Sequence, residues 1–207
     1  MKSKKNLLEK LKPLPYFGKD AVRQLGRQLG LKDTTLDTYV SRFLKNREIV
    51  LLMRGLYVTT DFFEKNRADI SYSFYLANIL RKPSYVSSWA ALQYYDLVTE
   101  VIHSITSVTL KVTREYRTRA GNFSYQSIDK RSFSDFVLKK EKFEFFIATP
   151  SKALFDLLYF RTRGFRGVAI DRIKLMIDEL RIEFDDMDKE EQKKFHSMLK
   201  TFYERTT

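Results

Sequence analysis

Six polar side chains between positions 34 and 45 recur at the spacing of one helix face, and none of them is acidic. Apolar side chains fill the opposite face, which predicts a helix from Thr34 to Asn46 with one buried side. The polar set has hydroxyls near the start and cations toward the end: Thr34, Thr35, Thr38, Ser41, Arg42 and Lys45. Hydroxyls exchange hydrogen bonds with base edges and cations pair with phosphates, so the pattern is typical of a helix that reads the major groove of DNA.

Two shorter helices are predicted before this one. Leucines at positions 7, 8 and 11 lie on one face of the first, and the prolines at positions 13 and 15 end it. The second begins near Lys19 and stops at Gly30. Asp33 or Thr34 is expected to cap the third helix by accepting a bond from a free backbone N–H.

Two β-prone runs follow, Ile49–Leu52 and Leu56–Thr59, joined around Arg54 and Gly55. Three helices and then a hairpin with a basic tip is the order of a winged helix-turn-helix, so we expect such a domain over residues 1–67. Arg54 is then expected to touch the DNA backbone or minor groove. The alternative for this domain is a protein-interaction adaptor that uses the same fold without sequence-specific DNA binding.

The charge of the chain is concentrated toward its beginning. Residues 1–60 hold thirteen Lys and Arg against five Asp and Glu, and the formal net charge of all 207 residues is +12. This excess favours a polyanion-binding module attached to a more balanced domain, although a basic surface kept for solubility gives the same count.

Residues 68–207 read as a second, larger α+β domain with a mostly antiparallel sheet and flanking helices. Alternation of apolar and polar residues predicts a strand from Val101 to Arg114, with a turn at Gly121 and Asn122. The other predicted strands and helices are Tyr85–Val86, Phe123–Ile128, Phe143–Ala148, Tyr72–Leu80, a helix capped by Ser87 or Ser88, a helix capped by Thr149 and opened by Pro150, Asp171–Leu180, and a last helix with a capping box of Asp188 and Glu191.

No set of residues for catalysis, metal binding or a cofactor is evident. The chain has no cysteine, and its two histidines, His103 and His196, lack neighbouring ligands at zinc spacing. The segment Gly164–Gly167 lacks the Lys-Ser/Thr of a phosphate loop. We therefore expect a protein that is not an enzyme and uses no cofactor and no metal.

A second group of cations lies on and beyond the long predicted strand: Lys111, Arg114, Arg117 and Arg119. Charged side chains often guard a sheet edge against aggregation, which is one explanation. The other is a second contact surface for nucleic acid, and an enzyme acting on RNA or DNA through this cluster is the least favoured alternative.

The chain resembles the AbiE-type antitoxins (AbiEi family) of type IV toxin-antitoxin, or abortive infection, systems over nearly its whole length. The residues that carry the resemblance are Arg54-Gly-Leu-Tyr-Val58, Pro83-Ser-Tyr-Val-Ser-Ser-Trp-Ala-Ala-Leu-Gln-Tyr-Tyr-Asp-Leu97, Ile105-Thr-Ser-Val-Thr109 and Ala148-Thr-Pro-Ser-Lys-Ala-Leu-Phe-Asp-Leu-Leu158. The family often has glycine where this chain has Asp96.

The resemblance implies a transcriptional autorepressor whose first domain binds operator DNA in its own promoter, at inverted repeats. It also implies that residues 68–207 counteract a nucleotidyltransferase-like toxin, in a phage-defence system, without needing a stable complex with it. The longest aliphatic run, Ile49–Met53, is far short of the roughly 18 residues that span a membrane, and the start lacks the apolar region of a signal peptide. We expect no membrane partner and a cytoplasmic location.

Overall fold

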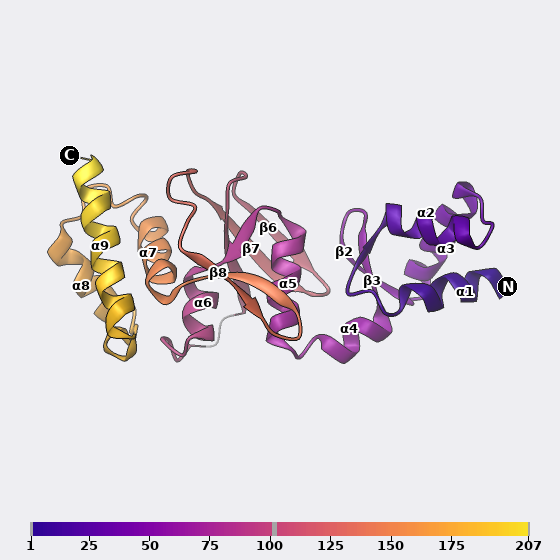
Figure 1. Cartoon of the computed structure of the whole chain (residues 1–207), viewed down its shortest axis with the longest axis horizontal. Helices are drawn as coiled ribbons and strands as arrows, with labels where there is room; N and C mark the ends of the chain where they lie inside the picture. Colours follow the sequence, from indigo (N-terminus) through magenta and orange to yellow (C-terminus); the bar gives the residue numbers. More distant parts are fainter. Residues whose placement is uncertain (1, 101–102, 207) are drawn as a thin grey trace. The chain divides into compact units, whose positions relative to one another are not determined.

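The computed structural model describes residues 2–100 and 103–206 and has mixed α and β structure (Figure 1). Two compact units are present. One comprises the residues up to Ser73 together with Tyr116–Gly121, and the other comprises Phe74–Glu115 and the residues from Asn122 onward. No helix in the described ranges is long and apolar enough to cross a membrane.

The first unit contains helices and a small sheet. Its elements are α1 (Lys2–Leu11), β1 (Phe17–Gly18), α2 (Lys19–Gln28), α3 (Asp33–Lys45), β2 (Ile49–Met53), β3 (Leu56–Thr59) and α4 (Thr60–Asn66). The three strands form an antiparallel sheet in the order β1-β3-β2. The three predicted helices and the hairpin with its turn at Arg54 and Gly55 are confirmed as elements, whereas β1 and α4 were not predicted.

One apolar core holds these elements together. Its buried members come from α1, α2, α3 and all three strands: Leu7, Leu11, Phe17, Val22, Leu36, Phe43, Ile49 and Tyr57. α2 and α3 pack closely at Gly26, because a Cβ added there would lie 2.5 Å from the end of the Leu36 side chain. Glycine at position 26 therefore sets how closely α3 lies against α2.

The predicted cap of α3 is wrong. Lys32, in an extended conformation, is the N-cap residue and makes no side-chain capping bond, while Asp33 is already helical. A carboxylate in the first turn still interacts favourably with the helix dipole, so Asp33 stabilises this end by charge rather than by capping. The helix α4 was missed because its N-cap residue, Thr59, is also the last residue of β3. The Thr59 hydroxyl accepts a hydrogen bond from Phe62 N at 3.3 Å.

The elements after α4 are α5 (Ile70–Leu80), β4 (Ser84–Val86), α6 (Ser88–Tyr94), β5 (Ser104–Thr109), β6 (Arg114–Thr118), β7 (Gly121–Ser127), β8 (Phe136–Lys140), β9 (Glu144–Ala148), α7 (Pro150–Arg161), α8 (Ile170–Glu179), a 3₁₀ turn (Phe184–Asp186) and α9 (Lys189–Thr206). Their strands form one sheet in the order β6-β7-β5-β4-β9-β8. Thr149 caps α7 and Pro150 opens it, as predicted, and the Asp188 carboxylate accepts from Glu190 N at 2.8 Å at the start of α9.

This sheet is mixed, so the expectation of a mostly antiparallel sheet is confirmed only in part. β4 pairs antiparallel with β5, and β8 with β9, but β4 pairs parallel with β9, and β5 with β7. The parallel pairing of β5 with β7 was missed because β6, which lies between them in the chain, has a charged sequence without alternation. The turn before β7 is at Arg119 and Ala120 rather than at Gly121 and Asn122. Val101 and Ile102 of the predicted strand lie outside the described residues.

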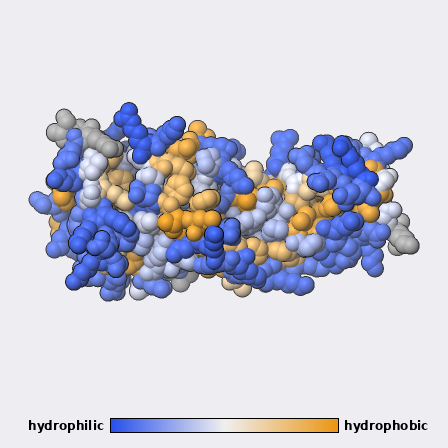
Figure 2. All heavy atoms as spheres, in the orientation of Figure 1, coloured by the Kyte–Doolittle hydropathy of each residue, from blue (hydrophilic) through white to orange (hydrophobic). Residues whose placement is uncertain are grey.

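An exposed apolar strand lies at one edge of the sheet. Figure 2 shows hydrophobic side chains gathered in the area of β8, where Val137 and Leu138 are 40% and 41% exposed. Lys139 and Lys140 follow them on the same strand. Charged residues on an edge strand discourage pairing with another chain, which fits their position here.

Candidate nucleic-acid interface

The predicted polar face of α3 lies on the surface. Leu36 and Phe43 are buried in the core and orient the helix, which leaves the opposite side open. Five of the six predicted residues are exposed and Thr35 is half-buried: Thr34, Thr38, Ser41, Arg42, Lys45 and Thr35. The structure therefore brings these residues together on one accessible face, with hydroxyls in the first half and cations in the last turn.

Two hydroxyls of this face are already bonded to their own helix. Thr38 Oγ1 donates to the Thr34 carbonyl at 3.1 Å, and Ser41 Oγ donates to the Asp37 carbonyl at 2.9 Å. In this arrangement each hydroxyl oxygen keeps lone pairs free of that bond, so it can accept a hydrogen bond from an amino group of a base. Donation to a base would require the hydroxyl to rotate away from the helix carbonyl.

Arg42, Lys45 and Arg54 lack ion-pair partners among the described residues, whereas other cations of this unit, such as Lys4 and Arg23, are paired. Lys4 pairs with Glu48 at 3.0 Å, and Arg23 lies 3.6 Å from Asp33. The contact with Arg23 offsets the negative charge that Asp33 brings to the start of α3. Asp37 is exposed and is the remaining acidic side chain on this helix.

Arg54 lies in the turn between β2 and β3, and it is exposed. Gly55 beside it has φ +82°, a conformation that glycine adopts without strain and that a tight hairpin turn requires. The register shifts between Leu51 and Met53, which marks an irregular end of the β2/β3 ladder. The hairpin therefore presents a cation at its tip on a backbone that a glycine allows to turn.

The second predicted cation group is divided among three short segments. Lys111 lies in a bend after β5, Arg114 and Arg117 lie on β6, and Arg119 lies in the turn before β7. All four side chains are exposed, and Arg114 and Arg117 have interactions of their own within the protein. β6 is an edge strand of the sheet, which agrees with the edge-guarding explanation.

A buried polar cluster in the second unit was not predicted from the sequence. This cluster, called the Lys152 cluster, consists of Lys152, Asp156, Tyr85 and Ser87. Lys152 Nζ lies 2.7 Å from Asp156 Oδ1, and both side chains are at most 2% exposed. Tyr85 and Ser87 hydroxyls donate to Asp156 Oδ2 at 3.0 and 2.7 Å. The i,i+4 spacing of a Lys and an Asp on a helix was the available signal, but that spacing is typical of surface pairs.

Burial governs the ionisation of this cluster. Loss of solvation raises the pKa of the Asp156 carboxyl, while the charge of Lys152 and the hydroxyl donors oppose that rise. Burial and the Asp156 charge also raise the pKa of the Tyr85 hydroxyl, which keeps it protonated and able to donate. The cluster is thus suited to fixing α7 on the sheet rather than to exchanging protons with a substrate.

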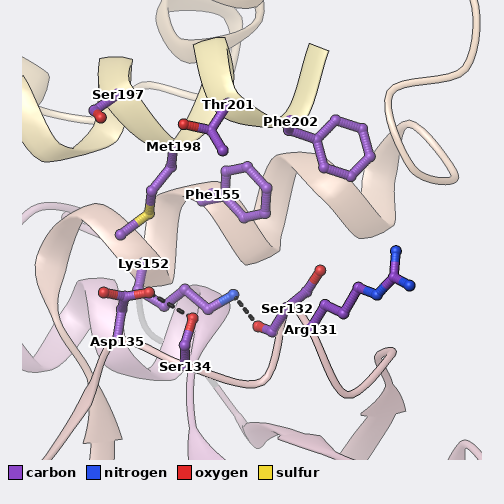
Figure 3. A pocket seen from close by; sticks show the side chains of 10 residues that line it. All are labelled: Arg131, Ser132, Ser134, Asp135, Lys152, Phe155, Ser197, Met198, Thr201 and Phe202. Carbon is purple, nitrogen blue, oxygen red and sulfur yellow. Dashed lines mark hydrogen bonds between the residues drawn. The ribbon is translucent and has the colours of Figure 1, made fainter. Parts of the chain in front are cut away.

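A cavity of about 300 Å³ opens beside Lys152 (Figure 3). Phe155 and Phe202 form its apolar part, and Arg131 lies on its wall. Lys152 Nζ donates to the Ser132 carbonyl at 2.7 Å and lies 5.0 Å from the centre of the Phe155 ring. Because the ammonium group is held by Asp156, this carbonyl and this ring, it is anchored in the wall of the cavity.

Three of the four motifs that carry the family resemblance contribute to the Lys152 cluster or its support. Tyr85 and Ser87 come from the second motif, Lys152 and Asp156 from the fourth, and Thr106 of the third donates to the Ser87 carbonyl at 2.5 Å. These motifs therefore build one buried junction between β4, β5 and α7. Asp96 has φ +56°, the left-handed conformation that glycine adopts most easily, which accounts for glycine being an alternative there.

Comparison with protein-family models and with curated proteins found no match to this chain. In the described ranges, no group of three or more His, Cys, Asp or Glu side chains is placed to hold a metal ion.

Proposed function

We propose that the first unit is a winged helix-turn-helix domain that binds operator DNA through α3 and the β2/β3 hairpin. The observation that carries this proposal is the accessible face of α3, where exposed hydroxyls and cations face away from the core that holds the helix. The order of three helices and a hairpin, with a glycine turn beside Arg54, supports the proposal.

Gel-shift titration against the DNA upstream of the gene tests this half. Arg42→Ala is expected to weaken binding to all sequences and to reduce the salt dependence by about one phosphate contact. Thr38→Ala is expected to reduce discrimination between operator and unrelated duplex, because base contacts carry sequence information. Arg67→Ala removes an exposed cation that pairs with Glu64 at 2.9 Å and serves as the matched control. Unchanged binding by both α3 variants overturns the assignment of the reading helix.

We further propose that the protein is an autorepressor and antitoxin that counteracts a nucleotidyltransferase-like toxin. This half rests on the four motifs, three of which contribute to the buried Lys152 cluster and to its support by β5. Expression of the neighbouring gene, with and without this protein, tests it. If the second unit neutralises the toxin, the neighbouring gene is expected to arrest growth, and both the wild-type chain and Arg42→Ala are expected to relieve that arrest. A neighbouring gene that is harmless, or toxicity that this chain does not relieve, contradicts the proposal.

A further inference from the structure

The loop between α7 and α8 borders a cavity whose lining combines arginines with aromatic side chains. This cavity, of about 750 Å³, is lined by ten residues from α7, the loop and α9: Tyr159, Arg163, Gly164, Phe165, Arg166, Gly167, Val168, Ala169, Phe202 and Tyr203. Its charged residues are both arginines, and four of the ten carry aromatic rings. A pocket of this size and lining can take one or two nucleotides of an extended strand.

Aromatic rings form one wall of the cavity. Tyr159 lies 5.7 Å from Phe202 and 6.0 Å from Phe165, centre to centre, with nearly perpendicular rings in both pairs. Phe165 is buried, whereas Tyr159, Phe202 and Tyr203 are half-buried and so keep part of their surface open. Partly exposed aromatic rings can stack on unpaired bases, and they do so with little dependence on sequence.

The positive charge of the loop is concentrated. Arg161, Arg163 and Arg166 lie within six residues, all three are exposed, and no acidic residue interrupts them. Burial and the charge of Asp129 raise the pKa of the Tyr159 hydroxyl, and the charge of Arg166 opposes that rise. The Arg166 guanidinium therefore lies within electrostatic reach of the ring that lines the cavity, where it can meet a phosphate next to a stacked base.

The loop is held in shape before any ligand binds. Gly164 N donates to the Tyr159 carbonyl at 2.7 Å, Phe165 N donates to Thr162 Oγ1 at 2.8 Å, and Tyr203 Oη donates to the Val168 carbonyl at 2.6 Å. Arg163 and Phe165 both have φ +54°, a conformation that costs free energy in residues other than glycine. These hydrogen bonds and the packing of Phe165 keep the strained loop in place.

The loop also offers backbone donors. Within the described part of the chain, the N–H groups of Arg166 and Gly167 make no hydrogen bond, and both residues are exposed. Successive free N–H groups in a turn that contains a left-handed residue are a common binding element for anions, and Gly167 has φ +68°. Arg163, Arg166 and Gly167 all line the cavity, so cations and backbone donors belong to the same lining.

We propose that this cavity binds a single-stranded nucleic-acid segment, with an unpaired base against Tyr159 and Phe202 and its phosphate at Arg163, Arg166 and the loop N–H groups. A paired base is inaccessible to these rings, so duplexes are poor ligands for this site. The site is separate from α3, and it goes beyond the proposed operator binding because the two surfaces recognise different forms of nucleic acid.

Photo-crosslinking of the full-length protein tests this inference. The probes are a ten-nucleotide oligouridine that contains 4-thiouridine and a ten-nucleotide oligothymidine that contains 4-thiothymidine. Adducts are expected on residues 159–168 or 202–203, identified by mass spectrometry after digestion. A stronger adduct with the RNA probe identifies RNA as the ligand, and a stronger one with the DNA probe identifies single-stranded DNA. Adducts confined to other segments overturn the inference.

Binding measurements by fluorescence anisotropy with the same oligonucleotides complete the test. Tyr159→Leu and Arg166→Gln are each expected to raise Kd about fivefold or more, and Tyr159→Phe is expected to retain binding because it keeps the ring. Arg172→Gln, an exposed arginine that pairs with Glu179, is the matched control. Operator affinity is expected to be unchanged in the cavity variants and reduced in Arg42→Ala, so failure of either proposal is distinguishable. Wild-type Kd values for Tyr159→Leu and Arg166→Gln contradict this site.

Discussion

Replacement of Lys152 by methionine should destabilise the second unit strongly. The substitution removes the cation 2.7 Å from Asp156 and the bond to the Ser132 carbonyl, but it keeps most of the side-chain volume. The Asp156 carboxylate, with 0% of its side chain exposed, is then left with only the Tyr85 and Ser87 hydroxyls. Breaking a buried pair by removing one partner costs about 3–5 kcal/mol. The corresponding fall in Tm is on the order of 10 °C.

The single tryptophan of the chain provides the assay, because Trp89 lies on α6 in the same unit as the cluster. Urea unfolding followed by its fluorescence gives the free energy of unfolding of wild type, Lys152→Met and the double variant Lys152→Met/Asp156→Leu. The double variant is expected to recover part of the loss, because it removes the unpaired buried carboxylate but also takes the acceptor from the Tyr85 and Ser87 hydroxyls. A loss below about 1 kcal/mol in the single variant, or no recovery in the double one, refutes the reasoning.

The pH dependence of the single variant provides a second check with a defined sign. Burial raises the pKa of the Asp156 carboxyl, so the folded state binds its proton more tightly than the unfolded state does. Without Lys152 to oppose it, that effect grows. The stability of Lys152→Met should therefore increase relative to wild type as the pH is lowered from 8 toward 5, and a relative decrease contradicts the assignment.

Two further substitutions test the packing of α2 on α3 and the contact between α9 and α7. Gly26→Val should lower the free energy of unfolding of the first unit by about 1–3 kcal/mol, measured by thermal melting, because its side chain overlaps buried Leu36. For Glu191, burial opposes ionisation, but hydrogen bonds from Lys194 and Ser151 dominate and lower its pKa. A carboxyl group whose pKa is lowered on folding stabilises the protein at pH values above its unfolded pKa, and this stabilisation is lost as the pH falls through its folded pKa. Glu191→Gln should therefore make the free energy of unfolding less dependent on pH below about pH 5.

Matched controls accompany both substitutions. Gln28→Val places the same side chain at an exposed position of α2 and should change stability little. Glu190→Gln removes an exposed carboxylate one residue earlier, which forms a surface pair with Lys193 at 3.4 Å. A wild-type melting temperature for Gly26→Val, or a free energy of unfolding that depends equally on pH below about pH 5 in Glu191→Gln and wild type, contradicts the respective packing or pairing.

Most of the helices were predictable because their apolar residues recur at helical spacing and their ends carry strong signals. Thr149 and Pro150 at the start of α7 are one example, since a capping hydroxyl followed by proline fits little else. The hairpin at Arg54 and Gly55 was equally predictable, because a glycine between two β-prone runs indicates a turn. Local sequence determines these elements, so one sequence suffices to find them.

The direction of strands and the buried polar cluster were not predictable in the same way. Whether β5 pairs parallel with β7 depends on where β6 lies, and the sequence of β6 gives no alternation to reveal it. Lys152 and Asp156 are residue types that are rarely buried. Their burial depends on hydroxyls from Tyr85 on β4 and from Ser87 just after it, more than sixty residues earlier in the chain. Spacing along one helix carries no information about such distant partners.

The face of α3 was predictable as a set of residues, but its chemistry needed the structure. The Thr38 and Ser41 hydroxyls already donate to helix carbonyls, so without rotation they can only accept a hydrogen bond from a base. Likewise, the contact of Arg23 with Asp33 explains how a carboxylate is tolerated at the start of a helix proposed to approach phosphates. Both facts depend on geometry that a helical wheel does not contain.

The salt dependence of operator binding is the most direct test of the central proposal, that α3 and the hairpin tip bind DNA. Kd for the upstream duplex is measured between 50 and 200 mM salt for wild type, Arg42→Ala, Arg54→Ala and the control Arg67→Ala. Over this salt range, a protein with six phosphate contacts loses affinity by about 10³-fold. The slope of log K against log salt should fall by about one in each of the first two variants and stay unchanged in the control. Equal slopes in all four proteins would contradict the account.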